Sequence, residues 1–90
     1  MKIDTLFERA LETAASDLHL RVGLPPILRI NGHLRQQGDY SVLTNNDIVQ
    51  MLDQITSQEQ RDRLSQEKEL DFAYALDLKA RFRINVMVQR

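Results

Sequence analysis

The sequence predicts an α+β domain with a mainly antiparallel sheet of about five strands and about three helices. Three segments have a large apolar residue at every second position, the pattern of a half-buried strand. They are Asp17–Val22, Leu70–Leu76 and Arg81–Val88. Other segments repeat apolar residues at helical spacing, and the predicted order is one helix, three strands, two helices and two strands. Runs of this kind are typical of the α+β class.

The first half of the chain is predicted to contain one helix and three strands. Apolar residues recur at helical spacing over residues 3–14, and Asp4 is expected to cap the helix. The strand Asp17–Val22 follows and ends at a glycine and two prolines. An Asn-Gly dipeptide then favours a tight hairpin between the strand Ile27–Ile30 and a third strand over His33–Gln37.

Two helices are predicted in the middle of the chain. Thr44 is expected to cap the first, and Ser57 with Gln60 three residues later forms the capping-box pattern of the second. The second helix has little besides Leu64 to bury, so we expect it to be a surface element. The apolar face of the first is predicted to contain Ile48, Val49, Leu52 and Ile55.

The last predicted strand, Arg81–Val88, has one apolar and one polar face. Because strand side chains alternate, Arg81, Arg83 and Asn85 share the polar face. A row of guanidinium groups on a sheet is a preformed anion-binding surface. The alternative is a solvated, salt-bridged face, since Asp71 lies at the corresponding position of the preceding strand. The apolar face consists of Phe82, Ile84, Val86 and Val88.

Length and composition predict one domain, residues 1–90. Of these residues 42% are hydrophobic and 28% are charged, which is ordinary for a globular protein. Twelve basic against 13 acidic residues give a net charge of −1, which argues against nucleic-acid binding. No cysteine, signal peptide or apolar run of about 20 residues is present, so we expect a cytoplasmic protein without a transmembrane segment.

Catalytic and metal sites find little support in the sequence. The three glycines are scattered, so there is no glycine-rich phosphate loop. His19 and His33 are too few for a zinc site, and we expect Asp17 and His19, which share a strand face, to form a local hydrogen-bonding brace. The sequence therefore predicts no catalytic residue and no metal ligand.

Five segments resemble one family in their order and spacing. The first contains Ser-Asp-Leu-His, the second is Gly-x-Pro-Pro, the third spans the Asn-Gly turn, and the last two form the closing hairpin. They are Ala15–Leu20, Gly23–Pro26, Leu28–Leu34, Glu69–Phe72 and Ala80–Asn85. Over essentially the whole chain they resemble the N-terminal domain of the PilT-like twitching-motility ATPases. These are type IV pilus retraction motors of the type II/IV secretion ATPase superfamily.

This resemblance implies a PAS-like fold and a longer parent protein. The chain stops directly after a predicted strand, so we expect residues 1–90 to be a fragment that lacks a following RecA-like ATPase domain. In such motors ATP binds with magnesium between the two domains, and the N-terminal domain contributes arginines toward the nucleotide. Matched to this sequence, Arg83 is the first nucleotide-binding residue expected, followed by Arg81 and Arg29.

The resemblance also implies what this chain lacks. The Walker A loop and the catalytic motifs belong to the second domain, so this chain alone is not expected to be an enzyme or to hold a cofactor, whereas its parent would be an ATPase. The implied partners are its own and neighbouring ATPase domains in a homohexamer, and the inner-membrane pilus machinery. The implied location is the cytoplasm, peripherally at the inner membrane.

Two other functions fit the residues. An independent PAS-like sensor of a small molecule predicts a cavity inside the domain. A protein-interaction module, in which the arginines form only salt bridges, predicts that Arg81 and Arg83 both pair with internal carboxylates. A nucleic-acid binder is the least favoured because the chain lacks a row of aromatic residues for stacking.

Overall fold

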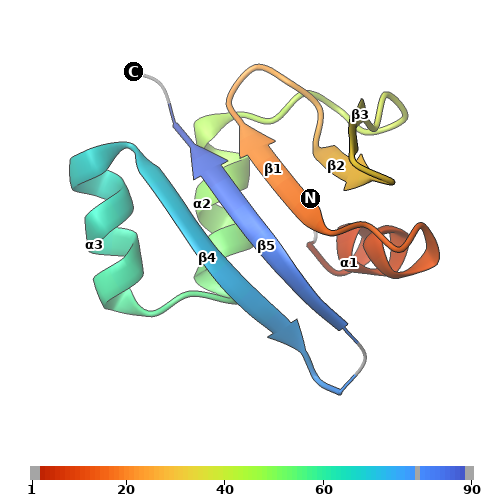
Figure 1. The fold of residues 1–90 in the computed structure, drawn as a ribbon. Helices are drawn as coiled ribbons and strands as arrows, with labels where there is room; N and C mark the ends of the chain where they lie inside the picture. Colours follow the sequence, from red (N-terminus) through yellow and green to blue (C-terminus); the bar gives the residue numbers. More distant parts are fainter. Residues whose placement is uncertain (1–2, 79, 89–90) are drawn as a thin grey trace.

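A five-stranded mixed sheet forms the centre of the computed structural model, which describes residues 3–78 and 80–88. The strand order is β3-β2-β1-β5-β4, and all neighbours are antiparallel except the central β1–β5 pair (Figure 1). The predicted α+β fold with a mainly antiparallel sheet is thus confirmed. None of the described helices is long and apolar enough to cross a membrane. The elements are α1 Ile3–Glu12, β1 Asp17–Arg21, β2 Ile27–Ile30, β3 His33–Gln36, α2 Asn45–Asp53, α3 Gln58–Glu67, β4 Glu69–Leu76 and β5 Ala80–Met87.

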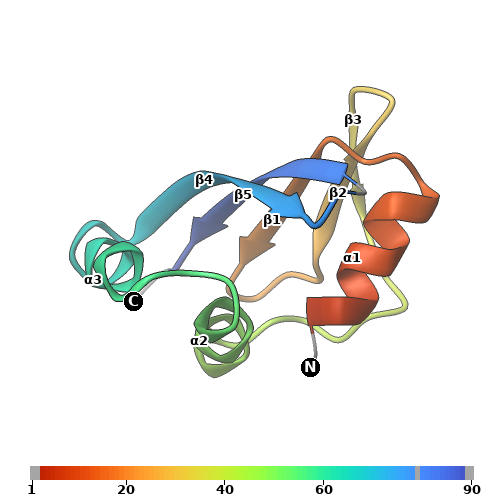
Figure 2. The ribbon, with the colours of Figure 1, turned by 90° about the horizontal axis from the view of Figure 1, so that it is seen from below.

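The core lies between the helices and one face of the sheet. In Figure 2, α2 and α3 lie below the strands. The alternation of β1 and β5 turns Leu18 and Ile84, which are register partners, toward this side, where both are buried. The ring of Phe7 on α1 stacks on Tyr74 and Phe82 with centroid distances of 5.1 and 5.7 Å. These contacts attach α1 to the half of the β4–β5 hairpin that lies next to its turn.

Local hydrogen bonds begin α2 and α3 where the sequence predicts. The Thr44 hydroxyl accepts from the Asp47 amide, and the Asp47 carboxylate accepts from the Thr44 amide. Ser57 and Gln60 form the same reciprocal capping box at the start of α3. Both predicted caps are confirmed, and Leu64 is the buried residue of α3.

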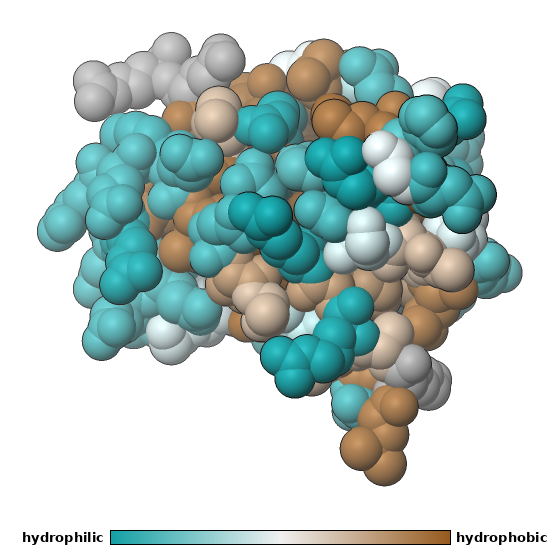
Figure 3. Space-filling model, viewed as in Figure 1, coloured by the Kyte–Doolittle hydropathy of each residue, from teal (hydrophilic) through white to brown (hydrophobic). Residues whose placement is uncertain are grey.

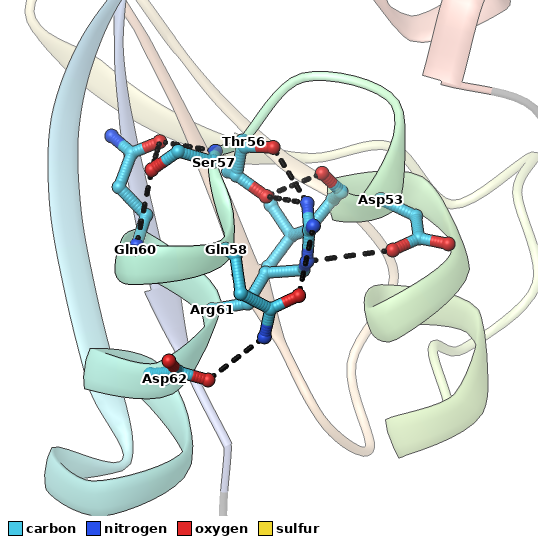
Figure 4. Close-up of polar contacts among 8 residues, drawn as sticks. Asp53, Thr56, Ser57, Gln58, Gln60, Arg61 and Asp62 are labelled. Atoms are coloured by element: carbon cyan, nitrogen blue, oxygen red, sulfur yellow. Dashed lines mark hydrogen bonds and ion pairs between the residues drawn. The ribbon is translucent and has the colours of Figure 1, made fainter.

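Arg61 holds the connection between α2 and α3 in place (Figure 4). Its Nη1 atom donates to the Thr56 carbonyl oxygen at 2.6 Å and lies 3.2 Å from the hydroxyl of the same residue. Its Nε atom lies 3.5 Å from the Asp53 carboxylate at the end of α2. The guanidinium group therefore links the two helices across their turn.

Two expectations about the helices are wrong in detail. Asp4 does not cap α1, because the helix already begins at the buried Ile3; Asp4 lies in the first turn, where its charge still favours the helix dipole. Val49 is 45% exposed, and Met51 is buried instead. The buried stripe of α2 follows i, i+3, i+4 spacing from Ile48, and position 49 lies to one side of it.

Replacing Phe7 tests the contact between α1 and the hairpin. Phe7→Ala removes a buried ring that stacks on two others, so we expect a loss of about 3–5 kcal/mol in the free energy of unfolding. Urea denaturation followed by circular dichroism measures it. Val49→Ala is the control, with an expected change within about 0.5 kcal/mol because Val49 is half exposed. Equal effects of the two substitutions would contradict this packing.

Candidate functional site

The face of the sheet opposite the helices is rich in charged side chains. The strand registers align Arg29, Asp17 and Arg83 across β2, β1 and β5, and place His19 beside Asn85 in the next row. This face points toward the viewer in Figure 1. Figure 3, drawn in the same view, shows hydrophilic side chains over the middle of the sheet. We term it the open face, comprising Asp17, His19, Arg21, Arg29, Glu69, Asp71, Arg81, Arg83 and Asn85.

Arg83 forms a bidentate ion pair with Asp71 on the neighbouring strand. Its Nε atom donates to Asp71 Oδ1 at 2.9 Å, and its Nη2 atom donates to Oδ2. These bonds lower the pKa of the Asp71 carboxyl below its usual value. The side chain of Arg83 is nevertheless 64% exposed, so water screens the pair and its net contribution to stability is small.

Arg81 differs from Arg83 in having no ion pair or side-chain hydrogen bond with any residue in the described ranges 3–78 and 80–88. It is exposed near the end of the hairpin, and its register partner is Ala75. The interaction-module alternative required both arginines to pair with internal carboxylates. In the described residues only Arg83 does so, and the Arg81 guanidinium can bind an anion without breaking a contact to any of them.

Arg29 is directed partly toward its own hairpin. Its Nη1 atom donates to the Gly32 carbonyl oxygen at 3.0 Å. Its Nε atom lies 3.9 Å from the carboxylate of Asp17, which separates Arg29 from Arg83 in the sheet. The three predicted arginines thus share the open face, but each has a different set of neighbours.

Arg21 is a further member of this face and was not among the predicted site residues. Its Nη2 atom donates to Asn85 Oδ1 at 3.1 Å and lies 3.5 Å from His19 Nδ1, while Nη1 contacts the Met87 sulfur. The signal was available, because Arg21 lies two residues after His19 in an alternating strand and must share its face. Arg21 supplies a fourth guanidinium group, although its contacts with β5 occupy it.

His19 is a largely buried ionisable side chain at the centre of the open face. It is only 12% exposed, and its Nε2 atom has no hydrogen-bond partner among the described residues. That atom lies 3.8 Å from Asp17 Oδ2, so the hydrogen-bonding brace expected between these two residues does not form. Burial lowers the pKa of His19, as do the charges of Arg21 and Arg29, while Asp17 and Asn85 act in the opposite direction.

Charge on the open face is mixed, with a small excess of arginine. Its four guanidinium groups face three carboxylates, although the whole chain has a net charge of −1. Planar guanidinium groups on adjacent strands can donate several parallel hydrogen bonds to a phosphate or carboxylate. The arrangement suits the binding of an anion that brings its remaining contacts from elsewhere.

A surface hollow of about 440 Å³ lies between α2 and α3, away from the open face. Its apolar lining includes Val49, Leu52 and Leu64, and the charged residues Arg61 and Lys68 also border it. The small-molecule sensor predicted a cavity inside the core. This hollow instead opens at the surface beside the helices, so it does not favour the sensor.

Comparison with known proteins shows what the whole chain resembles. No protein-family model matches the chain. Over 89 residues the chain is 33% identical to the type IV pilus retractation ATPase PilT of Pseudomonas aeruginosa, covering 99% of this chain and 26% of that protein. A crystal structure of the pilus retraction motor PilT with bound ADP matches all of this chain, with 34% identity and a TM-score of 0.75. The domain is PilT-like.

The resemblance to the N-terminal domain of pilus retraction ATPases is therefore confirmed. The PilT-like domain spans only about a quarter of its relatives, 26% of the curated protein and 26% of the crystallised chain. The TM-score of 0.75 over the whole chain shows that the fold described above is also present in the motor with bound ADP.

Acid should weaken the PilT-like domain through His19. The folded-state pKa lies below that of an unfolded imidazole, about 6.5, so the folded protein binds fewer protons between the two values. The free energy of unfolding should fall as the pH drops through about 6.5, and this contribution should level off below the folded-state pKa. Urea denaturation at a series of pH values measures this dependence. His19→Gln should remove it, whereas replacing the exposed His33 should leave it; identical profiles for wild type and His19→Gln would refute the assignment.

The Asp71–Arg83 pair predicts a specific change in one carboxyl titration. In Arg83→Gln the pKa of Asp71 should rise toward its ordinary range, because the two donated hydrogen bonds that stabilise the carboxylate are lost. Carboxyl ¹³C NMR over a pH series reports it directly. Arg81→Gln is the matched control and should leave the pKa of Asp71 unchanged. A shift of equal size in both variants would show that general charge, and not this pair, sets the titration.

Proposed function

We propose that this PilT-like domain is the N-terminal regulatory and nucleotide-contacting domain of a hexameric ATPase that powers type IV pilus retraction and twitching motility. The observation that supports this function best is the arginine-rich open face, over which no described helix packs. The whole domain is also similar to a retraction motor that was crystallised with ADP, and ADP is an anion of the kind that guanidinium groups bind. In this proposal the nucleotide is Mg-ATP, bound between this domain and a RecA-like ATPase domain.

The three predicted arginines would play different parts at the nucleotide. Arg81, which has no partner in the described residues, would donate directly to a phosphate or ribose oxygen. Arg83 would exchange its exposed partner Asp71 for the nucleotide, at little cost because the ion pair is solvated. Arg29 would extend the same row from β2. ATP would thereby hold two domains closed, and hydrolysis would release them, as in a domain-closure switch.

The remaining features follow from this function. The chain alone would hydrolyse nothing and would hold no cofactor, because most phosphate contacts would come from the ATPase domain. Its partners would be its own and neighbouring ATPase domains in a homohexamer, and the pilus machinery at the inner membrane. The protein would act in the cytoplasm, peripherally at that membrane, and would bind no nucleic acid.

Substitution in the full-length parent tests the arginine proposal. Arg81→Gln removes a charged donor worth about 1.5–3 kcal/mol, so we expect kcat/KM for ATP to fall about 10- to 100-fold. Arg83→Gln should act in the same direction. Arg35→Gln is the matched control: Arg35 is also exposed, but it lies on β3 next to Leu34, the register partner of Arg29, and so points away from the open face. Turnover is measured as phosphate release against ATP concentration.

The interaction module is the alternative, and the Asp71–Arg83 ion pair is the observation that favours it. It predicts unchanged ATP kinetics for both Arg81→Gln and Arg83→Gln in a parent protein that still assembles. Such a result would reject nucleotide contact by this face, whatever the parent protein does.

A further inference from the structure

The two edges of the sheet differ in length and chemistry. At one edge, β3 has four residues, all exposed, including His33, Arg35 and Gln36. At the other edge, β4 has eight residues, and none of them is lysine, proline or glycine. Natural sheets block exposed edges with short strands, charges or proline, because an unpaired edge offers a template for another strand. Along the stretch from Leu70 to Leu76, β4 has only one charged side chain, Asp71, which Arg83 already binds.

The hydrogen bonds of β5 show which backbone groups of β4 are unpaired. The Arg83 amide donates to the Ser16 carbonyl oxygen at 3.0 Å, so the backbone groups of Arg83 point toward β1. The Val88 amide donates to the Lys68 carbonyl oxygen, on the side of β4. Backbone direction alternates along a strand, so the even-numbered residues of β5 bond to β4, and their register partners on β4 are also even-numbered. The outward backbone groups of β4 therefore belong to its odd-numbered residues, which are Glu69, Asp71, Ala73 and Ala75.

We propose that this edge pairs with the same edge of a second copy of the chain. In the proposed antiparallel register Ala73 lies on the two-fold axis opposite its own counterpart, and Asp71 of each copy lies opposite Ala75 of the other. These three positions have the outward amide and carbonyl groups, so each opposed pair can exchange two backbone hydrogen bonds. The result is a continuous sheet through both copies, with an isologous interface. The inference does not depend on the proposed nucleotide contact.

Side chains on both faces of β4 favour this register. On the helix side it places Phe72 opposite Tyr74 and Leu70 opposite Leu76, which are the apolar cross-strand pairs that stabilise sheets. Phe72, Tyr74 and Leu76 are only partly buried in one copy, so the second copy would cover them further. A slip by one residue would put apolar side chains on the open face and is disfavoured.

The open face and α3 leave room for the added strand. Ala73 and Ala75 are small and exposed, and no like charges lie directly opposite within Leu70–Leu76. β4 is the outer strand in Figure 1, and Figure 2 shows the neighbouring α3 below the level of the strands. The backbone of α3 thus lies on the helix side of the sheet and not in the plane of the strands. These observations select a second copy as the occupant, because the edge is complementary to itself.

Disulfide trapping tests the register directly, since the chain contains no cysteine. Across the two-fold axis, Ala73→Cys should place its two Cα atoms about 5.5 Å apart, within the range that a disulfide spans. Mild oxidation should shift the mass from 10.5 kDa to about twice that value on non-reducing gels. Ala75→Cys is the matched control, exposed on the same face and edge, but its two Cα atoms would lie about 14 Å apart and should not cross-link. Equal cross-linking of the two variants would overturn the register.

Sedimentation equilibrium of the unmodified chain gives an independent result. The mass should rise with concentration from 10.5 kDa toward twice that value. Ala73→Pro removes an outward amide without breaking a bond to β5, so it should remain folded by circular dichroism and monomeric. A wild-type chain that stays monomeric at millimolar concentration would overturn the proposal and leave the edge to a strand of another protein. So would an Ala73→Pro variant that folds and associates as strongly as the wild type.

Discussion

The parallel pairing of β1 with β5 is the constraint on which the rest of the structure depends. It joins Asp17 to Arg83 and Leu18 to Ile84, segments from opposite ends of the chain. Even-numbered residues of the two strands, such as Leu18 and Ile84, form the centre of the core. Odd-numbered residues, such as Asp17 and Arg83, form the centre of the open face. A shift of one residue in this register would exchange the two faces, so burial of the apolar set fixes the position of the charged set.

Much of the fold could be predicted because its signals are local. Alternation located the strands, and Thr44 and Ser57 marked the starts of α2 and α3 correctly. The pairing of β1 with β5 could not be predicted in this way, since alternation shows which face a side chain occupies but does not identify the neighbouring strand. Asp4 and Val49 were placed wrongly because a shift of one residue at a helix end or around a helix axis lies within the tolerance of the pattern.

The sequence predicted which residues lie on the open face better than it predicted which of their side chains contact each other. Hairpin geometry made the approach of Arg83 to Asp71 foreseeable, because β4 and β5 are consecutive. The absence of a hydrogen bond between Asp17 and His19 was not foreseeable, since it depends on the conformations that the two side chains adopt in the folded protein. The alternation of side chains along a strand decides which residues lie on the face. The rotamers in the folded protein decide which of these side chains touch.

Because of these contacts, the arginines of the open face differ in how readily each could bind an incoming anion, and such a difference would suit a switch. Arg21 is held by β5, Arg83 is held by an exposed carboxylate that water screens, and Arg81 has no described partner. An incoming phosphate would meet Arg81 first and could then compete with Asp71 for Arg83. The unpaired edge of β4 lies beside this surface but involves backbone groups, so the two surfaces can be occupied separately.

The most direct test of the central claim is a structure of the full-length parent protein with a non-hydrolysable ATP analogue and magnesium. The account predicts phosphate or ribose oxygens within about 3 Å of the guanidinium of Arg81 or Arg83, with the Asp71–Arg83 pair loosened where Arg83 is used. A structure with nucleotide bound, in which Arg29, Arg81 and Arg83 contact only their own domain, would contradict it.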